Sequence, residues 1–108
     1  MTANAMTALP PGSTIGILGG GQLGRMLAMA AARLGFKSHI YAPEADSPAF
    51  EVAAAHTIAA YEDEAQLAAF AKAVDVATYE FENIPVATVE FLSRQIPVRP
   101  GAKALACA

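Results

Sequence analysis

The chain has 108 residues, of which 55% are hydrophobic and 16% charged, and its formal net charge is −3. This length suits one domain that buries a core without disulfides or a structural metal, and the apolar composition argues against a disordered chain. The acidic balance and the lack of any run of Lys or Arg argue against a nucleic-acid partner, and no apolar stretch approaches the roughly 20 residues that cross a bilayer.

Cysteine and histidine are too few and too scattered to form a disulfide or a zinc site. Cys107 is the single cysteine, and His39 and His56 have no Cys or His at the spacing of metal ligands. We therefore expect a protein of the reducing cytoplasm with no structural metal. Residues 1–12 lack the features of a secretory signal and are expected to form a disordered lead-in.

The first expected elements are a strand and a helix joined by glycines. Residues 14–18 form a short apolar run that stops at three consecutive glycines, as a buried parallel strand does. Met26 and Met29 are interpreted as packing residues of the helix that follows, and Gly35 stands where a C-cap glycine belongs. Three- and four-residue spacing predicts that one apolar stripe of this helix faces a sheet: Leu23, Met26, Leu27, Ala30, Ala31 and Leu34.

The middle of the chain predicts two more strands and a second helix. Residues 37–41 and 56–59 are expected as strands, with a loop or short helix over residues 45–54 between them. A helix is expected over residues 63–73, because its first residue, an aspartate, and Gln66 resemble a capping box ahead of an apolar stripe.

The last third of the chain repeats the alternation of strand and helix. Residues 74–79 predict a strand, and a helix should follow with Asn83 as its cap and Pro85 in its first turn, ending near Arg94. Residues 96–98 predict a fifth strand. Strands that alternate with helices in this way predict right-handed crossovers and an open α/β fold, a Rossmann-like parallel sheet flanked by helices.

A glycine-rich turn is the strongest functional signal. Residues 19–24, Gly-Gly-Gly-Gln-Leu-Gly, match the pattern Gly-x-Gly-x-x-Gly between an expected strand and an expected helix. Glycines permit a tight turn close to a ligand, and the helix start offers free N–H groups and a positive dipole end to an anion. We expect a phosphate group here; the competing interpretation is a turn that only brings the helix close to the sheet.

A dinucleotide ligand would also need an acidic residue at the end of the second strand, to bind the ribose hydroxyls. Tyr41 is instead followed by Ala42 and Pro43, and the nearest acids, Glu44 and Asp46, lie beyond the proline. This weakens the interpretation as an NAD-binding domain without excluding it.

A second candidate site is the acidic turn after residues 74–79. Glu80 and Glu82 flank Phe81 at the carboxyl end of a strand, the edge where open α/β sheets bind ligands. Such a carboxylate is suited to sugar hydroxyls or an amine of a ribonucleotide. The alternative is that both glutamates are solvated and favour the next helix through its dipole, by a few tenths to about 1 kcal/mol each.

Other polar residues are weaker candidates for function. Arg25 is suited to neutralising a phosphate, although an Arg on an amphipathic helix is more often solvated. His39 and His56 are interpreted as packing or surface residues, and Cys107 has no visible base partner that would make it a nucleophile.

Several motifs together resemble the N5-carboxyaminoimidazole ribonucleotide synthase family. They cover most of the chain from residue 15, and their order and spacing are more specific than the glycine pattern alone. The motifs are Ile-Gly-Ile-Leu-Gly-Gly-Gly-Gln-Leu-Gly-Arg-Met over 15–26, Ala-Arg-Leu-Gly over 32–35, Asp-Ser-Pro-Ala over 46–49, Thr-Tyr-Glu-Phe-Glu-Asn-Ile-Pro over 78–85 and Pro-Val-Arg-Pro-Gly over 97–101.

The resemblance implies an ATP-grasp ligase of purine biosynthesis, which carboxylates aminoimidazole ribonucleotide with bicarbonate while ATP is cleaved. It implies that the turn at Gly21, through the backbone of Gln22 and Leu23, holds the 5′-phosphate region. It also implies that Glu80 contacts the ribose or the aminoimidazole. ATP and Mg²⁺ would be bound mainly by later domains of such an enzyme, and family members usually form homodimers.

The resemblance also suggests how the chain divides. We expect a pre-ATP-grasp domain over residues 13–101 and the start of a truncated segment over residues 102–108, with no catalytic, cofactor-binding or metal-binding residue in this chain and no catalysis by it alone. Three alternatives remain: an NAD-binding dehydrogenase domain, a non-catalytic ligand-binding domain, and a related ATP-grasp enzyme such as formate-dependent glycinamide ribonucleotide transformylase.

Overall fold

The computed structural model describes residues 9–79 and 84–99. Strands and helices alternate along them, as the sequence predicts, and the short helix η2 occupies the segment expected to be a loop or short helix. The elements are β1 (Thr14–Leu18), α1 (Gln22–Arg33), β2 (Lys37–Ala42), the 3₁₀ helix η2 (Pro48–Val52), β3 (Ala55–Ile58), α2 (Glu64–Ala73), β4 (Val76–Tyr79) and α3 (Val86–Ser93).

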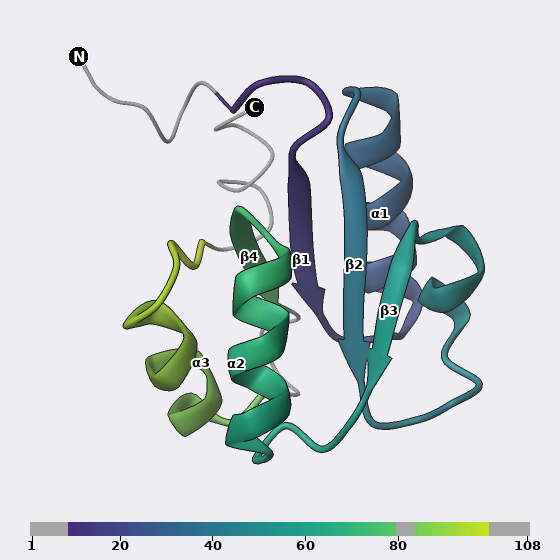
Figure 1. Ribbon diagram of the computed structural model, residues 1–108. Helices are drawn as coiled ribbons and strands as arrows, with labels where there is room; N and C mark the ends of the chain where they lie inside the picture. The colour runs from purple at the N-terminus through teal and green to yellow at the C-terminus, as the bar shows by residue number, and fades with distance from the viewer. Residues whose placement is uncertain (1–8, 80–83, 100–108) are drawn as a thin grey trace.

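The four strands form one parallel sheet in the order β3-β2-β1-β4. Helix α1 lies behind this sheet and helices α2 and α3 lie in front of it, so the strands are covered on both faces (Figure 1). All four strands point the same way, and their carboxyl ends meet at one edge. The open α/β fold with a parallel sheet between helices is confirmed.

The face covered by α1 contradicts one prediction. Three of the six residues of the expected stripe are exposed: Leu23 exposes 49% of its surface, Met26 64% and Leu34 52%. Met29, also interpreted as a packing residue, is exposed too. Ala31 and Leu27 of the stripe do pack against the core, and helix α1 also buries Gly24 and Ala28 against the sheet and η2. The prediction was wrong for the large side chains, because it gave them more weight than the small residues that let the helix backbone approach the strands closely.

The opposite face is packed with large side chains. Phe70 and Leu67 of α2, Leu92 of α3 and Tyr41 of β2 form one buried cluster, in which the Tyr41 and Phe70 ring centroids lie 5.3 Å apart at an interplanar angle of 65°. Edge-to-face rings of this kind contribute beyond the area that they bury. This cluster is the larger of the two cores by side-chain size.

Two helix ends follow the predicted chemistry. Gly35 adopts a φ of 89° after α1, which suits glycine, while its N–H donates to the Ala32 carbonyl and the Phe36 N–H donates to the Ala31 carbonyl. At the start of α2, the Asp63 carboxylate accepts the Gln66 N–H at 3.2 Å.

The last elements differ in detail from the prediction. Helix α3 begins after Pro85, which occupies the N-cap position expected for Asn83; Asn83 itself lies outside the described residues. The strand expected over residues 96–98 is reduced to one parallel bridge between Ala77 and Val98. The proline at position 97 has no N–H to donate to a neighbouring strand, which limits this pairing.

Parts of the expected domain plan fall outside the described residues, namely residues 1–8 of the lead-in, the segment 102–108 and Cys107. Among the helices in the described part of the chain, none has both the length and the apolar character to cross a membrane.

Candidate functional site

The edge where the strands end contains a change in strand order. From β1 the chain passes through α1 to β2 on one side, whereas β4 lies on the other side of β1. Ligands of open α/β sheets bind in the crevice at such a switch point, beyond the carboxyl ends of the strands. The register pairs Leu18 with Tyr79, so the glycine turn begins directly beside the end of β4.

Two glycines of the turn, Gly19 and Gly20, occupy positions that a larger residue would not fit. Gly19 has a φ of 123°, in the region that side chains rarely adopt. A Cβ on Gly20 would lie 2.9 Å from the Ala42 Cβ and closer still to Ser47, so only glycine fits without a shift of its neighbours. The glycines therefore have a steric role as well as a place in a motif.

Helix α1 begins at this turn without a side-chain cap. Gly21 is its N-cap, and no acidic residue lies in the first turn. The N–H groups of Gln22 and Leu23 have no acceptor within the helix, because the first turn of any helix leaves such donors unpaired. Both residues are exposed, so the turn combines accessible donors with the positive end of the helix dipole, which suits a phosphate.

Two buried polar atoms lie on the face of the sheet that α1 covers. The Arg25 Nε and the Thr78 hydroxyl are buried, and neither has a hydrogen-bond partner within the described ranges 9–79 and 84–99. Thr78 alternates with Ala77 along β4 and is 1% exposed. Sequence reasoning considered Arg25 and missed Thr78; the signal was a polar residue within an apolar strand.

The acidic turn cannot be placed with the same detail. Glu80 and Glu82 lie outside the described residues, and Tyr79 and Ile84 are their nearest described neighbours. A small cavity of about 170 Å³ lies beside these two neighbours, lined by Tyr79, Ile84, Val86, Val89 and Glu90.

The acids that a dinucleotide would require are placed elsewhere. Strand β2 ends at Ala42, and Glu44 and Asp46 are exposed in the segment after it. The Glu44 carbonyl accepts the Ser47 N–H at 3.3 Å and the Ser47 hydroxyl at 2.7 Å, so this segment folds into a turn. Among the residues that the structure describes, no carboxylate belongs to the last residues of β2, where a ribose would be bound.

Both histidines pack against aromatic rings, as the sequence analysis expects. The His39 Nε2 lies 2.7 Å from the Thr57 hydroxyl, and its ring meets Phe70 edge-on. Burial lowers the pKa of His39 below 6.5, and the positive charge of His56 lowers it further. His56 stacks on Phe50 with ring centroids 4.4 Å apart.

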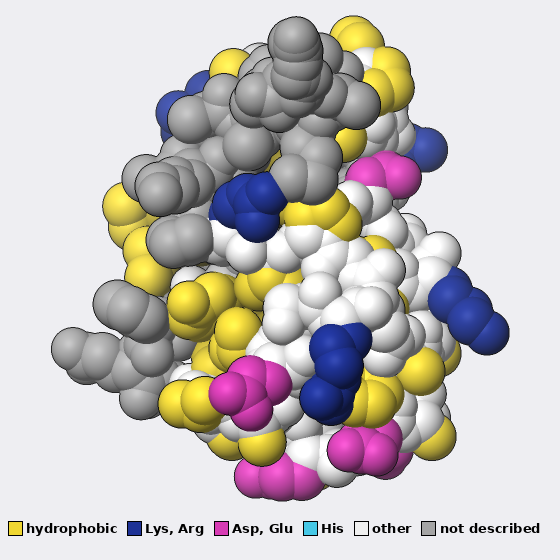
Figure 2. Space-filling view, turned by 90° about the vertical axis from the view of Figure 1, so that its left-hand side faces the viewer, with side chains coloured by type: hydrophobic (Ala, Val, Ile, Leu, Met, Phe, Trp, Pro, Cys, Tyr) yellow, Lys and Arg dark blue, Asp and Glu magenta, His cyan; other side chains and the backbone are white. Residues whose placement is uncertain are grey.

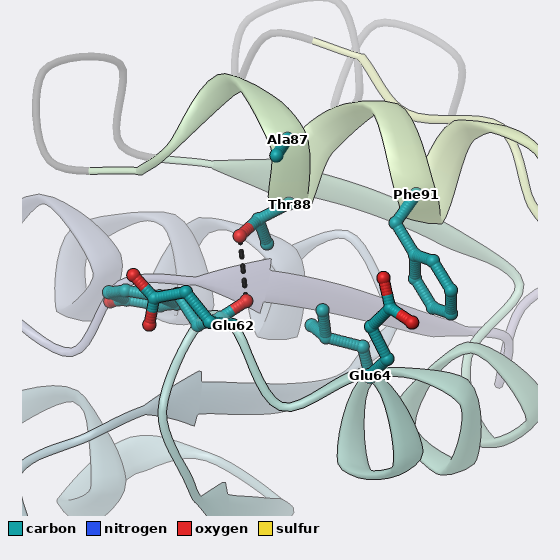
Figure 3. A pocket seen from close by; sticks show the side chains of 7 residues that line it. Glu62, Glu64, Ala87, Thr88 and Phe91 are labelled. Atoms are coloured by element: carbon teal, nitrogen blue, oxygen red, sulfur yellow. Dashed lines mark hydrogen bonds between the residues drawn. The ribbon is translucent and has the colours of Figure 1, made fainter.

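A second cavity was not foreseen from the sequence. It measures about 140 Å³ between α2 and α3, and its lining is Tyr61, Glu62, Glu64, Leu67, Ala87, Thr88 and Phe91. Figure 3 shows the Thr88 hydroxyl directed at the segment before α2, where it donates to the Tyr61 carbonyl at 2.6 Å. Little in the sequence indicates this cavity, because the cavity forms between two helices that are separated in sequence.

Acidic side chains gather at the edge of the sheet where the strands end. Burial raises the pKa of Tyr41 to about 12, with smaller contributions from the negative charges of Asp63 and Glu62. Figure 2 shows Asp and Glu side chains gathered toward the bottom of the molecule, the end to which the strands of Figure 1 point. No group of three metal-ligating side chains occurs among residues 9–79 and 84–99.

Known proteins match both the sequence and the fold. The family model of the ribonucleotide synthetase preATP-grasp domain matches residues 12–108. A bifunctional purine synthesis protein of Dictyostelium discoideum is 58% identical over 97 residues, which are 90% of this chain and 10% of that protein. The N5-carboxyaminoimidazole ribonucleotide synthase of Brucella melitensis is 56% identical over 99 residues, or 92% of this chain and 27% of that protein.

A solved structure adds ligands to the comparison. The N5-carboxyaminoimidazole synthase of Aspergillus clavatus, in complex with ADP and 5-aminoimidazole ribonucleotide, has a TM-score of 0.71 and 30% identity, over 88% of this chain and 26% of that one. The chain thus spans about a quarter of that structure and of the Brucella enzyme, and a tenth of the bifunctional protein. The chain belongs to the ribonucleotide synthetase preATP-grasp domain family.

Proposed function

We propose that the chain serves as the ribonucleotide-holding domain of an ATP-dependent ligase that carboxylates 5-aminoimidazole ribonucleotide with bicarbonate to N5-carboxyaminoimidazole ribonucleotide. The observation that carries the proposal is the uncapped start of α1 at the switch point of the sheet, beside the end of β4. Relatives named as synthases of this product support it. They support neither the NAD-binding alternative nor the glycinamide ribonucleotide enzyme.

The proposed division of labour follows from what each group offers. The turn at Gly21 binds the 5′-phosphate through the N–H groups of Gln22 and Leu23, because the donors of a first helical turn and the helix dipole stabilise an anion. Glu80 binds the ribose or the aminoimidazole, where a carboxylate accepts hydrogen bonds from hydroxyl or amine groups. Together they orient the ribonucleotide, so that its exocyclic amine is presented for carboxylation.

ATP and Mg²⁺ belong to the proposed reaction but are assigned to no residue of this chain. The chain corresponds to about a quarter of the length of the relatives that are named as synthases of this product. ATP supplies the activation of bicarbonate, and this chain supplies the position of the acceptor. We accordingly propose that the chain alone does not catalyse the reaction, and that the complete enzyme is a cytoplasmic homodimer.

Titration followed by NMR tests the proposal. We expect 5-aminoimidazole ribonucleotide to shift the amide signals of Gln22 and Leu23, and the nucleoside without the 5′-phosphate to bind more weakly. Gln22→Glu places a negative charge at the helix start, so it should weaken phosphate binding while leaving the fold intact. Gln95→Glu, an exposed position after α3, adds the same charge away from the site and is the matched control.

The role of Glu80 is tested in the same titration. Glu80→Ala should weaken binding of the ribonucleotide and of the nucleoside by the same factor, since its proposed contacts exclude the phosphate. NAD binding in place of ribonucleotide binding would overturn the proposed function.

A further inference from the structure

We infer that Ser47 is a positioning residue for the anion-binding turn, acting through Gly20 rather than touching the ligand. This inference rests on the proposed function of that turn. Ser47 belongs to the Asp-Ser-Pro-Ala segment after β2, which contributes no group to the proposed ligand contacts. The segment is nevertheless packed directly against the glycines.

Contact between Ser47 and Gly20 leaves no free space. A Cβ placed on Gly20 would overlap the Cβ and hydroxyl of Ser47 and would crowd Ala42 at 2.9 Å. Ser47 is itself buried at 6% exposure. The backbone of the turn is therefore seated against this side chain, and a shift of Ser47 changes the surface on which Gly20 rests.

Hydrogen bonds tie the turn to the same segment on both sides of this contact. The Gly19 N–H donates to the Tyr41 carbonyl at the end of β2, and the Ala49 N–H in η2 donates to the Gly20 carbonyl, both at 2.9 Å. Gly19 and Gly20 are thus anchored before and after Ser47 in the chain. Three consecutive glycines would otherwise allow many backbone conformations.

The hydroxyl of Ser47 reinforces the turn that sets where these anchors lie, beside the longer bond from the Ser47 N–H to the same Glu44 carbonyl at 3.3 Å. It donates to the Glu44 carbonyl at 2.7 Å and closes the turn between β2 and η2. This turn sets the distance between the Tyr41 carbonyl and the Ala49 N–H, which are the two groups that bind the glycines. Ser47 thereby controls the direction of the N–H groups that follow Gly20, and hydrogen bonds weaken steeply when their angle deteriorates.

The test compares Ser47→Ala with Ser93→Ala. Ser47→Ala keeps the Cβ that packs on Gly20 and removes the hydroxyl. The Ser93 hydroxyl donates to the Glu90 carbonyl three residues earlier at 3.0 Å, the same sequence spacing in an exposed position at the end of α3. It is therefore a matched control for the loss of such a bond away from the turn.

Two readouts separate a positioning role from a structural one. Ser47→Ala should weaken 5-aminoimidazole ribonucleotide binding about 3- to 10-fold, the loss expected for one hydrogen bond, but should leave binding of the nucleoside without phosphate nearly unchanged. In the free protein it should shift the amide signals of Gly20 to Leu23, and Ser93→Ala should change neither quantity.

Equal losses for ribonucleotide and nucleoside, or unchanged amide signals in the turn, would overturn the inference. If the unmodified chain binds no ribonucleotide, the proposed function fails. The amide signals of the free Ser47→Ala variant then still decide whether Ser47 positions the turn.

Discussion

The two faces of the sheet are covered by helices that pack through side chains of different size. Helix α1 rests on the sheet through Gly24, Ala28 and Ala31, whereas α2 buries Leu67 and Phe70. Small residues bring the α1 backbone close to the strands, and this closeness gives the glycine turn a defined position. Large residues on the other face bury more apolar area, which contributes more to stability.

The face of α1 thus positions the glycine turn, whereas the face of α2 and α3 contributes more to the stability of the fold. Changes that shrink side chains should be most harmful on the face of α2 and α3, and changes that enlarge them should be most harmful on the face of α1. The following predictions test this difference, from the largest expected effect to the smallest.

The largest effect is expected for Phe70→Ala. The ring is 1% exposed and contacts both His39 and Tyr41 edge-on, so truncation should lower the free energy of unfolding by about 3–5 kcal/mol. Urea unfolding followed by circular dichroism measures this loss. Val86→Ala, at a position that is 72% exposed, should change stability by no more than about 0.5 kcal/mol; similar losses for both variants would contradict the role given to the ring.

On the opposite face, Ala28→Leu should destabilise by enlargement. Ala28 is buried between α1 and the sheet, and extra methylenes in a packed core cost about 1–3 kcal/mol. Ala69→Leu on the exposed side of α2 is the control, because both residue types favour helices. Thermal unfolding of the two variants checks this, and an Ala28→Leu variant as stable as the control would show that α1 does not depend on close approach.

The two main helices also begin differently. The Asp63 carboxylate caps α2, whereas Gly21 leaves α1 without a side-chain cap. Asp63→Ala should cost about 1 kcal/mol, and Asp63→Asn much less, because asparagine caps equally well. Chemical unfolding of both variants measures the difference. Equal losses would mean that the charge of Asp63 matters and not its hydrogen bond to Gln66.

The smallest effect is a pH dependence on the face of α2. The folded-state pKa of His39 lies below its ordinary value of 6.5 because of burial, so the unfolded chain binds more protons between these two pKa values. Stability contributed by neutral His39 should therefore be present above 6.5 and be lost as the pH falls through that window. The free energy of unfolding, measured from about pH 8 down to about pH 5, should fall less steeply for His39→Gln than for the unmodified chain. An equally steep fall in both would mean that other groups cause the pH dependence.

Much of the fold is predictable because its signals are local. The β1 run ends at glycines, Gly35 occupies the left-handed position after α1, and Asp63 caps α2, each as its residue type favours. The buried face of α1 was predicted only in part, since spacing alone does not reveal that small residues such as Ala28 and Gly24 form much of the contact. The segment at Val98 forms only one bridge to β4, and the proline before it, which limits this pairing, was not weighed in the prediction of a fifth strand.

Candidate site residues divide in the same way. The glycine turn is visible in the sequence because φ values and close approach require glycine at particular positions. Thr78 and Ser47 lie in the motifs that carry the resemblance but were given no role, because a single Thr or Ser has no signature until its buried surroundings are known. The cavity beside Thr88 needs the packing of α2 on α3 and has no local signal.

By itself, the sequence determined the order of strands and helices, the parallel α/β fold and the glycine turn, because hydrophobic alternation, helix ends and glycine geometry are written in short stretches of chain. Only the tertiary structure decided which face of α1 is buried, that Ser47 supports Gly20, and that the turn lies beside the end of β4. These features depend on contacts between residues that are distant in sequence, where shape and burial decide and local preference does not.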